Sequence, residues 1–296
     1  MLPPKSWKPD AIARLFFSVL LCVFGASLAL TLFYYSGPAG AKALRLYLAG
    51  GAGLLLLFVT IVLMHRPWHY ETFPRRLLFL LVCVSGGLVF GLWAQTKGGP
   101  LPRTSSAQLM LIVEPLALVL LDQFLREHRI SWGEAFGLNE QAAVAILFGL
   151  MAAIIFLPLG WLLQWASAQS MVHLRLHPEE QEVVQTLKAS STLLNQVSLG
   201  IVAIFLAPIV EEVCFRGILY PAIKATGFPR LALWVAAIVF AWMHFNVVTF
   251  IPLLLLAIVL TMLYEFTGNL LASIAAHSLF NTVNFAVLYL TELRGH

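Results

Sequence analysis

The most informative segment of the chain reads Ala207-Pro208-Ile209-Val210-Glu211-Glu212-Val213-Cys214-Phe215-Arg216-Gly217. Two adjacent carboxylates and one guanidinium stand here inside a run that is otherwise apolar from about Leu199 to Tyr220. Charged side chains are unfavourable within a membrane and are retained mainly where they pair with one another or serve a function. The segment therefore predicts a transmembrane helix that carries a functional polar site.

The composition of the whole chain also indicates a membrane protein. Of its 296 residues, 60% are hydrophobic and only 11% are charged, whereas soluble domains carry about 25% charged residues. A soluble protein of this composition would expose a large apolar surface, so we predict an all-α polytopic transmembrane helical bundle. The net charge of +4 comes without a basic patch interleaved with aromatic residues, which argues against nucleic-acid binding and fits loops beside membrane lipid.

The apolar runs predict eight or nine membrane spans. The candidates are Leu15–Tyr35, Leu46–Met64, Leu77–Trp93, Gln108–Leu125, Ala142–Trp165, Leu193–Tyr220, Leu231–Phe245, Val247–Tyr264 and Leu270–Leu290. Two features leave the number open. Glu114-Pro115 can break the fourth span into a re-entrant half helix, and the seventh and eighth spans are joined tightly at Asn246.

The basic residues beside the spans predict the orientation of the protein. The basic segment 1–14 precedes an apolar run that is too long for a signal peptide, so we expect an uncleaved first span in an integral, multi-pass protein. The connection after the Glu-Glu segment carries Arg216, Lys224 and Arg230, whereas the next connection carries no Lys or Arg. Because cytoplasmic loops are enriched in these residues, we predict that the site opens toward the cytoplasm.

Two connections are predicted to form short helices at the membrane surface. Ser131 and Glu134 have capping-box spacing, which predicts one such helix near 131–138. Pro178 is predicted to begin the second, near 178–189, with acidic residues in its first turn. These acidic residues are Glu179, Glu180 and Glu182.

Helix geometry separates the roles of the two adjacent carboxylates. Glu212 and Arg216 are four residues apart, so they share one helix face in the order that favours an ion pair. Glu211 is rotated from Glu212 by about 100° around the helix axis and is left to face a cavity. Pro208 removes a backbone donor just upstream, which predicts a kink where the carboxylates begin.

Two later apolar segments each contribute a histidine. His244 follows Phe240 by four residues, and Asn281 follows His277 at the same spacing, so each pair shares a helix face. A rise of ~1.5 Å per residue places Glu211 about 14 Å, His244 about 21 Å and His277 about 11 Å from the ends of their spans. All three depths fall within a hydrocarbon layer of about 30 Å. One polar chamber is therefore expected to hold these side chains.

Two mechanisms fit this set of side chains. A carboxylate in an apolar chamber can take a proton from water, and a histidine can orient that water or protonate a leaving amine. The amide of Asn281 can donate a hydrogen bond to a developing oxyanion. Alternatively, Glu211, His244 and His277 are the ligand types of a catalytic zinc site with an open fourth position. The expected cofactor is accordingly zinc or none.

The motifs resemble those of the CPBP family, the CAAX-protease and bacteriocin-processing intramembrane endopeptidases, also called the Abi family, which includes the type II CAAX prenyl endopeptidases. The resemblance rests on Glu211-Glu212-x-x-x-Arg216, Phe240-x-x-x-His244 and His277-x-x-x-Asn281, and it covers about residues 193–290. It implies a catalytic core at 191–296, preceded by helices of unassigned role at 1–190.

The resemblance implies proteolysis inside the membrane, on a membrane-associated protein or peptide substrate such as a prenylated CAAX protein. It implies that Glu211 activates water, with His244 and His277 as polar or metal partners. Asn281 would be the oxyanion donor, and Glu212 and Arg216 would be supporting groups. The family is commonly labelled metalloprotease, although a metal-free glutamate mechanism is argued for some members.

Two other functions are compatible with the same sequence. A non-catalytic membrane scaffold or bacteriocin-immunity protein would keep the chamber as packing and would use the long N-terminal half to bind a partner. A proton-coupled transporter would use the intramembrane carboxylate and histidines as a proton relay, although the chain shows no obvious inverted repeat. The substrate and the oligomeric state do not follow from the sequence.

Overall fold

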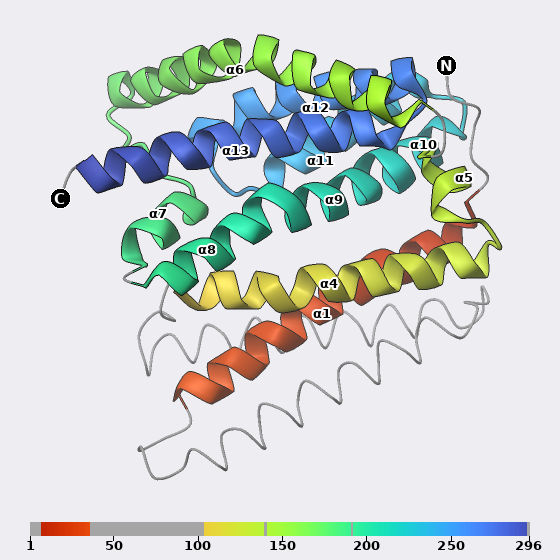
Figure 1. Cartoon of the computed structure of the whole chain (residues 1–296), viewed down its shortest axis with the longest axis horizontal. Coiled ribbons are helices and arrows are strands. Elements are labelled where there is room, and N and C mark those ends of the chain that lie inside the picture. The colour runs from red at the N-terminus through yellow and green to blue at the C-terminus, as the bar shows by residue number, and fades with distance from the viewer. Residues whose placement is uncertain (1–6, 36–103, 139–140, 191, 295–296) are drawn as a thin grey trace. The chain divides into compact units, whose positions relative to one another are not determined.

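The computed structural model describes residues 7–35, 104–138, 141–190 and 192–294. Every regular element in these ranges is a helix, which confirms the all-α prediction (Figure 1). The predicted spans 46–64 and 77–93 lie outside the described residues. The chain divides into two compact units, one formed by residues 1–7 and 125–296 and the other by residues 8–124.

The unit of residues 8–124 contains α1 (Pro9–Tyr35) and most of α4 (Thr104–Glu127). The alternative of a break at Glu114-Pro115 is wrong, because α4 continues through Pro115. A proline within an apolar helix is tolerated when neighbouring groups satisfy the carbonyl that it leaves without a donor. The fourth predicted span is therefore one helix.

The larger unit contains the remaining helices. They are α5 (Trp132–Phe136), α6 (Ala142–His173), α7 (Glu182–Ala189), α8 (Leu193–Ile201), η2 (Val202–Leu206), α9 (Ala207–Glu212), η3 (Val213–Leu219), α10 (Tyr220–Lys224), α11 (Pro229–Trp242), α12 (Val247–Thr267) and α13 (Leu270–Arg294). The segments from α8 to α10 follow one another without interruption and form one long helix, residues 193–224. Two of these segments, η2 and η3, are π-helical.

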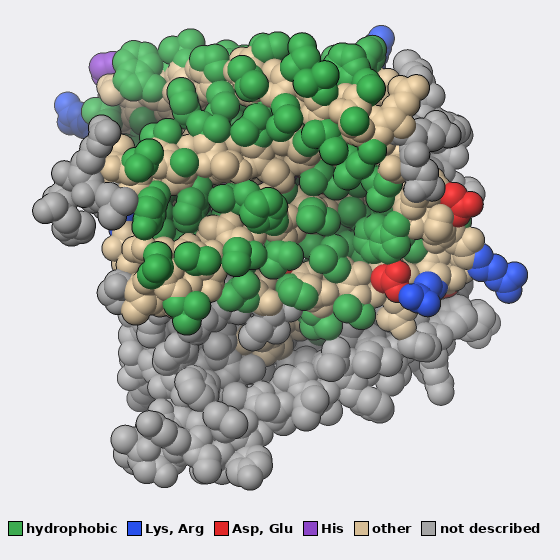
Figure 2. Space-filling view, in the orientation of Figure 1, with side chains coloured by type: hydrophobic (Ala, Val, Ile, Leu, Met, Phe, Trp, Pro, Cys, Tyr) green, Lys and Arg blue, Asp and Glu red, His purple; other side chains and the backbone are tan. Residues whose placement is uncertain are grey.

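Four described helices are long and apolar enough to cross a membrane: α6, the long helix 193–224, α12 and most of α13. Figure 2 shows hydrophobic side chains covering the visible face of these helices, with charged side chains at its margins. Large apolar side chains on this unit are exposed, among them Ile155 at 73% and Phe205 at 57%. Such a surface is stable against lipid rather than water, so the protein is an integral membrane protein. The number of spans, eight or nine, stays a prediction.

The helix α6 lies along α13 and α12 (Figure 1). Its approach to α13 depends on Gly149, where a Cβ atom would lie 2.2 Å from the carbonyl oxygen of Ala272. Small residues at such points let helix backbones approach closely in membranes. Although α6 precedes residue 190, it thus packs directly on the helices that follow.

The predicted helix near 131–138 is present as α5. The Ser131 hydroxyl accepts a hydrogen bond from the Glu134 N–H, and the Ser131 N–H donates to Glu134 Oε2 at 3.0 Å, which completes the capping box. The Ser131 hydroxyl also donates to Glu134 Oε2, at 2.7 Å. The hydrogen bonds that the Ser131 N–H and hydroxyl donate to the carboxylate stabilise its charged form and lower the pKa of Glu134. Gly137 ends the helix with φ of 69°, a left-handed conformation that suits glycine.

The predicted helix near 178–189 begins later than expected. Its first residue is Glu182, with Gln181 as the N-cap, so Glu179 and Glu180 precede the helix instead of lying in its first turn. The physical reason is that the carbonyl of Glu179, which would accept a helical hydrogen bond if the helix began at Pro178, accepts one from the Asn246 side chain instead. This contact holds the segment in an extended path over the beginning of α12.

Candidate active site

The two adjacent glutamates lie at the end of α9, between the two π-helical segments of the long helix. Pro208 stands at the N-terminal turn of α9 and cannot donate a backbone hydrogen bond. The sequence predicts a kink here, and the structure widens the helix into π turns on both sides of the glutamates. π-helical turns within α-helices occur frequently at functional sites, because they rotate the following side chains relative to a regular helix.

The predicted ion pair between Glu212 and Arg216 is confirmed. Arg216 NH1 donates to Glu212 Oε1 at 2.8 Å, and both side chains are almost completely buried, with 1% and 0% exposed. The same carboxylate oxygen accepts a second hydrogen bond from His277 Nδ1, also at 2.8 Å. Because an ionised carboxylate only accepts, the proton between these groups lies on His277 Nδ1.

Arg216 also joins the long helix to two other helices. Its NH2 donates to the carbonyl oxygen of Ala257 in α12 at 3.2 Å, and its guanidinium carbon lies 4.5 Å from the ring centroid of Phe240 in α11. A buried charge is tolerated when it is paired and its remaining donors are satisfied. These contacts fix Glu212, and through it His277, in one position.

Glu211 is placed differently from its neighbour. Its side chain is 28% exposed, and its Oε2 lies 3.9 Å from His277 Nε2. Among the described residues, Glu211 Oε2 has no hydrogen-bond partner. A distance of 3.9 Å is too long for a direct hydrogen bond and suits a bridging water. Glu211 is therefore a carboxylate with an acceptor available to a small polar molecule.

His244 belongs to the same cluster but lies on a turn, which corrects the predicted span. The helix α11 ends at Trp242, two residues before His244, and not at Phe245. His244 Nδ1 lies 2.8 Å from the carbonyl oxygen of Phe240, which can only accept, so Nδ1 carries a proton and, in a neutral ring, Nε2 is the acceptor. The Phe240 ring lies between the two histidines, with its centroid 5.0 Å from that of His244 and 5.7 Å from that of His277.

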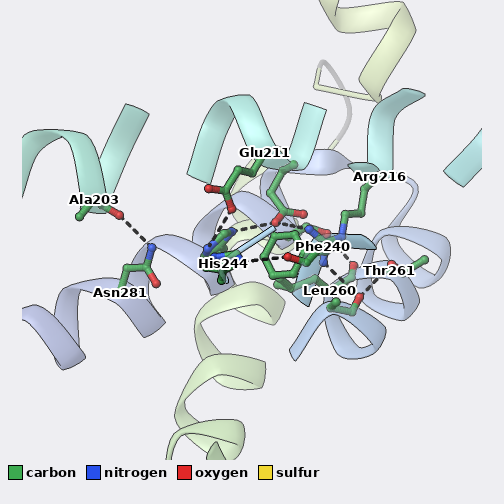
Figure 3. Close-up of polar contacts among 12 residues, drawn as sticks. Ala203, Glu211, Arg216, Phe240, His244, Leu260, Thr261 and Asn281 are labelled. Carbon is green, nitrogen blue, oxygen red and sulfur yellow. Dashed lines mark hydrogen bonds and ion pairs between the residues drawn. The ribbon is translucent and has the colours of Figure 1, made fainter. Parts of the chain in front are cut away.

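Asn281 makes a contact that the sequence does not predict. Its Nδ2 donates to the carbonyl oxygen of Ala203 in η2 at 2.8 Å. Figure 3 shows Asn281 turned toward Ala203, to one side of the cluster formed by Glu211, His244, Phe240 and Arg216. Asn281 is one helical turn from His277, so this bond ties the π-helical segment to the helix that carries His277. One of its two amide hydrogens stays available for another acceptor.

The donor chemistry of the site can be compared with the predicted zinc site. Both histidines commit Nδ1 to an oxygen acceptor, which in the neutral ring leaves Nε2 as the acceptor, as in zinc-binding histidines. However, the described ranges contain no group of three His, Cys, Asp or Glu side chains placed to hold a metal ion. The atom types fit zinc, the zinc site stays a prediction, and we derive no step through a metal.

The sequence does not reveal several polar contacts that surround the site. Ser273 donates to the carbonyl oxygen of Leu260 at 2.8 Å, and Thr261 donates to that of Ala257 at 2.9 Å, next to Arg216 (Figure 3). Phe240, which from sequence is a packing residue beside His244, contacts both histidines and Arg216. The spacing of four residues between Phe240 and His244 indicates that these two side chains share a face. Hydrogen bonds to backbone carbonyls cannot be predicted from the sequence, because every residue has a carbonyl.

These features define a helical integral membrane protein with a buried, hydrogen-bonded cluster of Glu, Arg and His. Residues 193–283 match the model of the Rce1-like family, described as type II CAAX prenyl endopeptidase. This match confirms the resemblance to the CAAX-protease family over that segment, which contains every candidate site residue, and it supports protease activity. Searches of curated proteins and of solved structures found no match to the chain.

Proposed function

We propose that the protein is an intramembrane endopeptidase that hydrolyses a peptide bond of a membrane-associated protein or peptide. The observation that carries the proposal is the unequal state of the two glutamates. Glu212 is 0% exposed and its Oε1 accepts hydrogen bonds from both Arg216 and His277. Glu211 is 28% exposed, and its Oε2 lies 3.9 Å from His277 Nε2. Oε2 of either glutamate has no hydrogen-bond partner among the described residues, so exposure and the ion pair are what separate them. The family match over residues 193–283 supports the same activity.

The first chemical step uses Glu211 as a general base. A water held between Glu211 Oε2 and His277 Nε2 donates one hydrogen to each, because both atoms are acceptors, and its oxygen is left to attack the peptide carbonyl. The new bond joins the water oxygen to the carbonyl carbon, and the proton passes to Glu211. The available amide hydrogen of Asn281 is our candidate donor to the oxyanion.

The second step breaks the peptide bond. The tetrahedral intermediate re-forms its carbonyl, the C–N bond breaks, and Glu211 returns the proton to the amine nitrogen. His244 presents Nε2 to the same chamber, where it can bind the leaving amine, since its Nδ1 is committed to Phe240. Glu212 and Arg216 do not touch the reacting atoms in this scheme, and they hold His277 in its tautomer.

The substrate class that we propose is the prenylated CAAX protein, with the site opening toward the cytoplasm. The description of the matched family supports this class, since it names the CAAX prenyl endopeptidases. Membrane lipid would hold the prenyl group beside the apolar face of the protein (Figure 2). Zinc is retained as the alternative source of water activation, and the experiment below measures it directly.

The test is cleavage of a farnesylated CAAX peptide by the full-length protein in detergent, comparing wild type with Glu211→Gln. We expect the variant to lose about 100-fold or more in kcat, the typical contribution of a general base. Glu127→Gln is the matched control, because it makes the same change at an exposed position of α4, and it should cleave at the wild-type rate.

Metal content and chelator sensitivity are measured on the same samples. Stoichiometric zinc with chelator-sensitive cleavage would assign Glu211, His244 and His277 as ligands and replace the metal-free scheme. A Glu211→Gln variant that cleaves as fast as wild type would overturn the proposed role of Glu211. A cellular phenotype that survives in this variant would favour the non-catalytic scaffold or immunity protein.

A further inference from the structure

His244 stands on an irregular piece of backbone. Residues 243–246 connect α11 to α12 and are not helical. Phe245, directly after His244, has φ of 46°, an unfavourable value for a residue with a bulky side chain, and it is 85% exposed. The N–H groups of residues 243–245 bond back to carbonyls of α11, so these bonds attach the turn to α11 alone.

Residues 179–181, which we call the strap, supply two hydrogen bonds to this region. Asn246 Nδ2 donates to the carbonyl oxygen of Glu179 at 2.9 Å. Gln181 Nε2 donates to Thr249 Oγ1 at 3.0 Å. Thr249 and Asn246 are themselves joined, since the Thr249 N–H donates to Asn246 Oδ1 at 3.0 Å as the N-cap of α12. The strap is thus bonded to both Asn246 and Thr249, the two residues that form the N-cap contact of α12 after His244.

The strap is itself attached to a fixed base. Gln185 Nε2 donates to the carbonyl oxygen of Glu180 at 2.8 Å, and Lys188 pairs with the Glu180 carboxylate at 2.7 Å. Both partners lie on α7, whose Thr186 and Leu187 are buried. The helix α7 packs against α8 and against α13, the helix that carries His277. The turn with His244 and the helix with His277 are therefore linked through α7.

We propose that Gln181 is a positioning residue for His244, acting through its hydrogen bond to Thr249. The strap fixes the turn so that His244 Nε2 keeps its place relative to His277 and Glu211. Gln181 belongs to none of the family motifs and contacts none of the proposed reacting groups. The catalytic part of this inference rests on the proposed function, whereas the attachment of the turn does not.

The experiment compares wild type with Gln181→Leu, which removes the amide and keeps a similar size. Hydrogen exchange of the backbone amides of residues 243–249 should become about fivefold faster, the factor that corresponds to the net contribution of one hydrogen bond. With a farnesylated CAAX peptide, kcat should fall about tenfold and KM should stay unchanged, since the substrate contacts are not altered.

Two further comparisons separate positioning from a general loss of structure. Gln169→Leu makes the same change at an exposed site on α6 and should alter neither measurement. Thr249→Val should speed exchange at least as much as Gln181→Leu, because it also removes the hydrogen bond that the Thr249 hydroxyl donates to Asn246 Oδ1 at 3.1 Å, and Thr249→Ser should retain wild-type behaviour. The double variant Gln181→Leu/Thr249→Val should be no worse than Thr249→Val alone. If Gln181→Leu does not fold, the two Thr249 variants decide the question.

Each contrary outcome has a distinct meaning. Unchanged exchange at residues 243–249 would overturn the attachment of the turn, whatever happens to cleavage. Faster exchange with unchanged kcat would overturn the positioning role. A wild-type protein that cleaves no peptide would refute the proposed function and the catalytic role of Gln181 with it, while exchange would still show whether the strap holds the turn.

Discussion

Neighbouring residues of the same type have opposite environments in this protein. Glu212 is fully buried and accepts hydrogen bonds from Arg216 and His277, while Glu211 is partly exposed and faces a single histidine nitrogen. The difference follows from a rotation of about 100° between consecutive residues of a helix. A pair of adjacent carboxylates can thus provide, from a single turn, one group held in an ion pair and one partly exposed group, which the proposed mechanism uses as the base.

Arg216 gives the first prediction at the residue scale. Arg216→Ala leaves the Glu212 carboxylate buried without its cation, so the free energy of unfolding should fall by about 3–5 kcal/mol. Glu211→Ala should change it much less, because Glu211 is partly exposed and unpaired with Arg216. Denaturation of the purified protein in mild detergent measures both. Equal losses of stability in the two variants would contradict the assigned division of roles.

Contacts between residues three or four positions apart in one helix were the part of the structure that the sequence could predict. The pairing of Glu212 with Arg216 and the capping box of Ser131 with Glu134 both depend on fixed helical spacing, so residue numbers suffice. The bond from Asn281 to Ala203 could not be predicted, because it depends on a backbone carbonyl in a π-helical segment. The position of His244 was missed because apolar residues continue past Trp242, where the helix ends.

At the scale of elements, short helices support the long helix that carries the glutamates. The helix α5 packs against η3, and Gly217 is the point of closest approach, since a Cβ atom there would lie 2.6 Å from Phe136 Cε1. The Gly217 carbonyl also accepts a hydrogen bond from Trp7 Nε1 at 3.2 Å. Position 217 therefore requires glycine because the Phe136 ring leaves no room for a Cβ atom, and not only because glycine is flexible.

Gly217→Ala tests this contact between elements. The added methyl group should displace the buried Phe136 ring and lower the stability by about 1–3 kcal/mol, as overpacking does in cores. Phe136→Leu should restore part of the loss in the double variant, because the smaller side chain makes room. Thermal unfolding in detergent is the measurement, and a Gly217→Ala protein as stable as wild type would show that α5 can move away at no cost.

At the scale of the whole molecule, the sequence predicted the class of fold and the membrane location well. Composition and apolar runs indicated an all-α membrane protein, and four described helices have the required length and hydropathy. Domain organisation was harder, because helix packing decides it. The helix α6 stands before the family match at residues 193–283, yet it packs along α12 and α13.

The orientation in the membrane gives the last prediction. The exposed turn after α10 holds Thr226, between Lys224 and Arg230. The distribution of basic residues predicts that this turn faces the cytoplasm, so Thr226→Cys should react with a membrane-impermeant maleimide in inverted vesicles and not in intact cells. Wild type supplies the background, since its described cysteines, Cys22 and Cys214, are buried. Labelling in intact cells would reverse the assigned orientation.

The ion pair of Glu212 with Arg216 has a consequence for charge conservation in the chamber. The pair is neutral as a unit, so with both histidines uncharged the site as a whole carries one negative charge, on Glu211. When Glu211 takes the proton from water in the proposed reaction, that charge passes to the oxyanion, and it returns when the proton goes to the amine. Charge is relocated over a short distance and is never created in the apolar interior, where creating it would be most unfavourable.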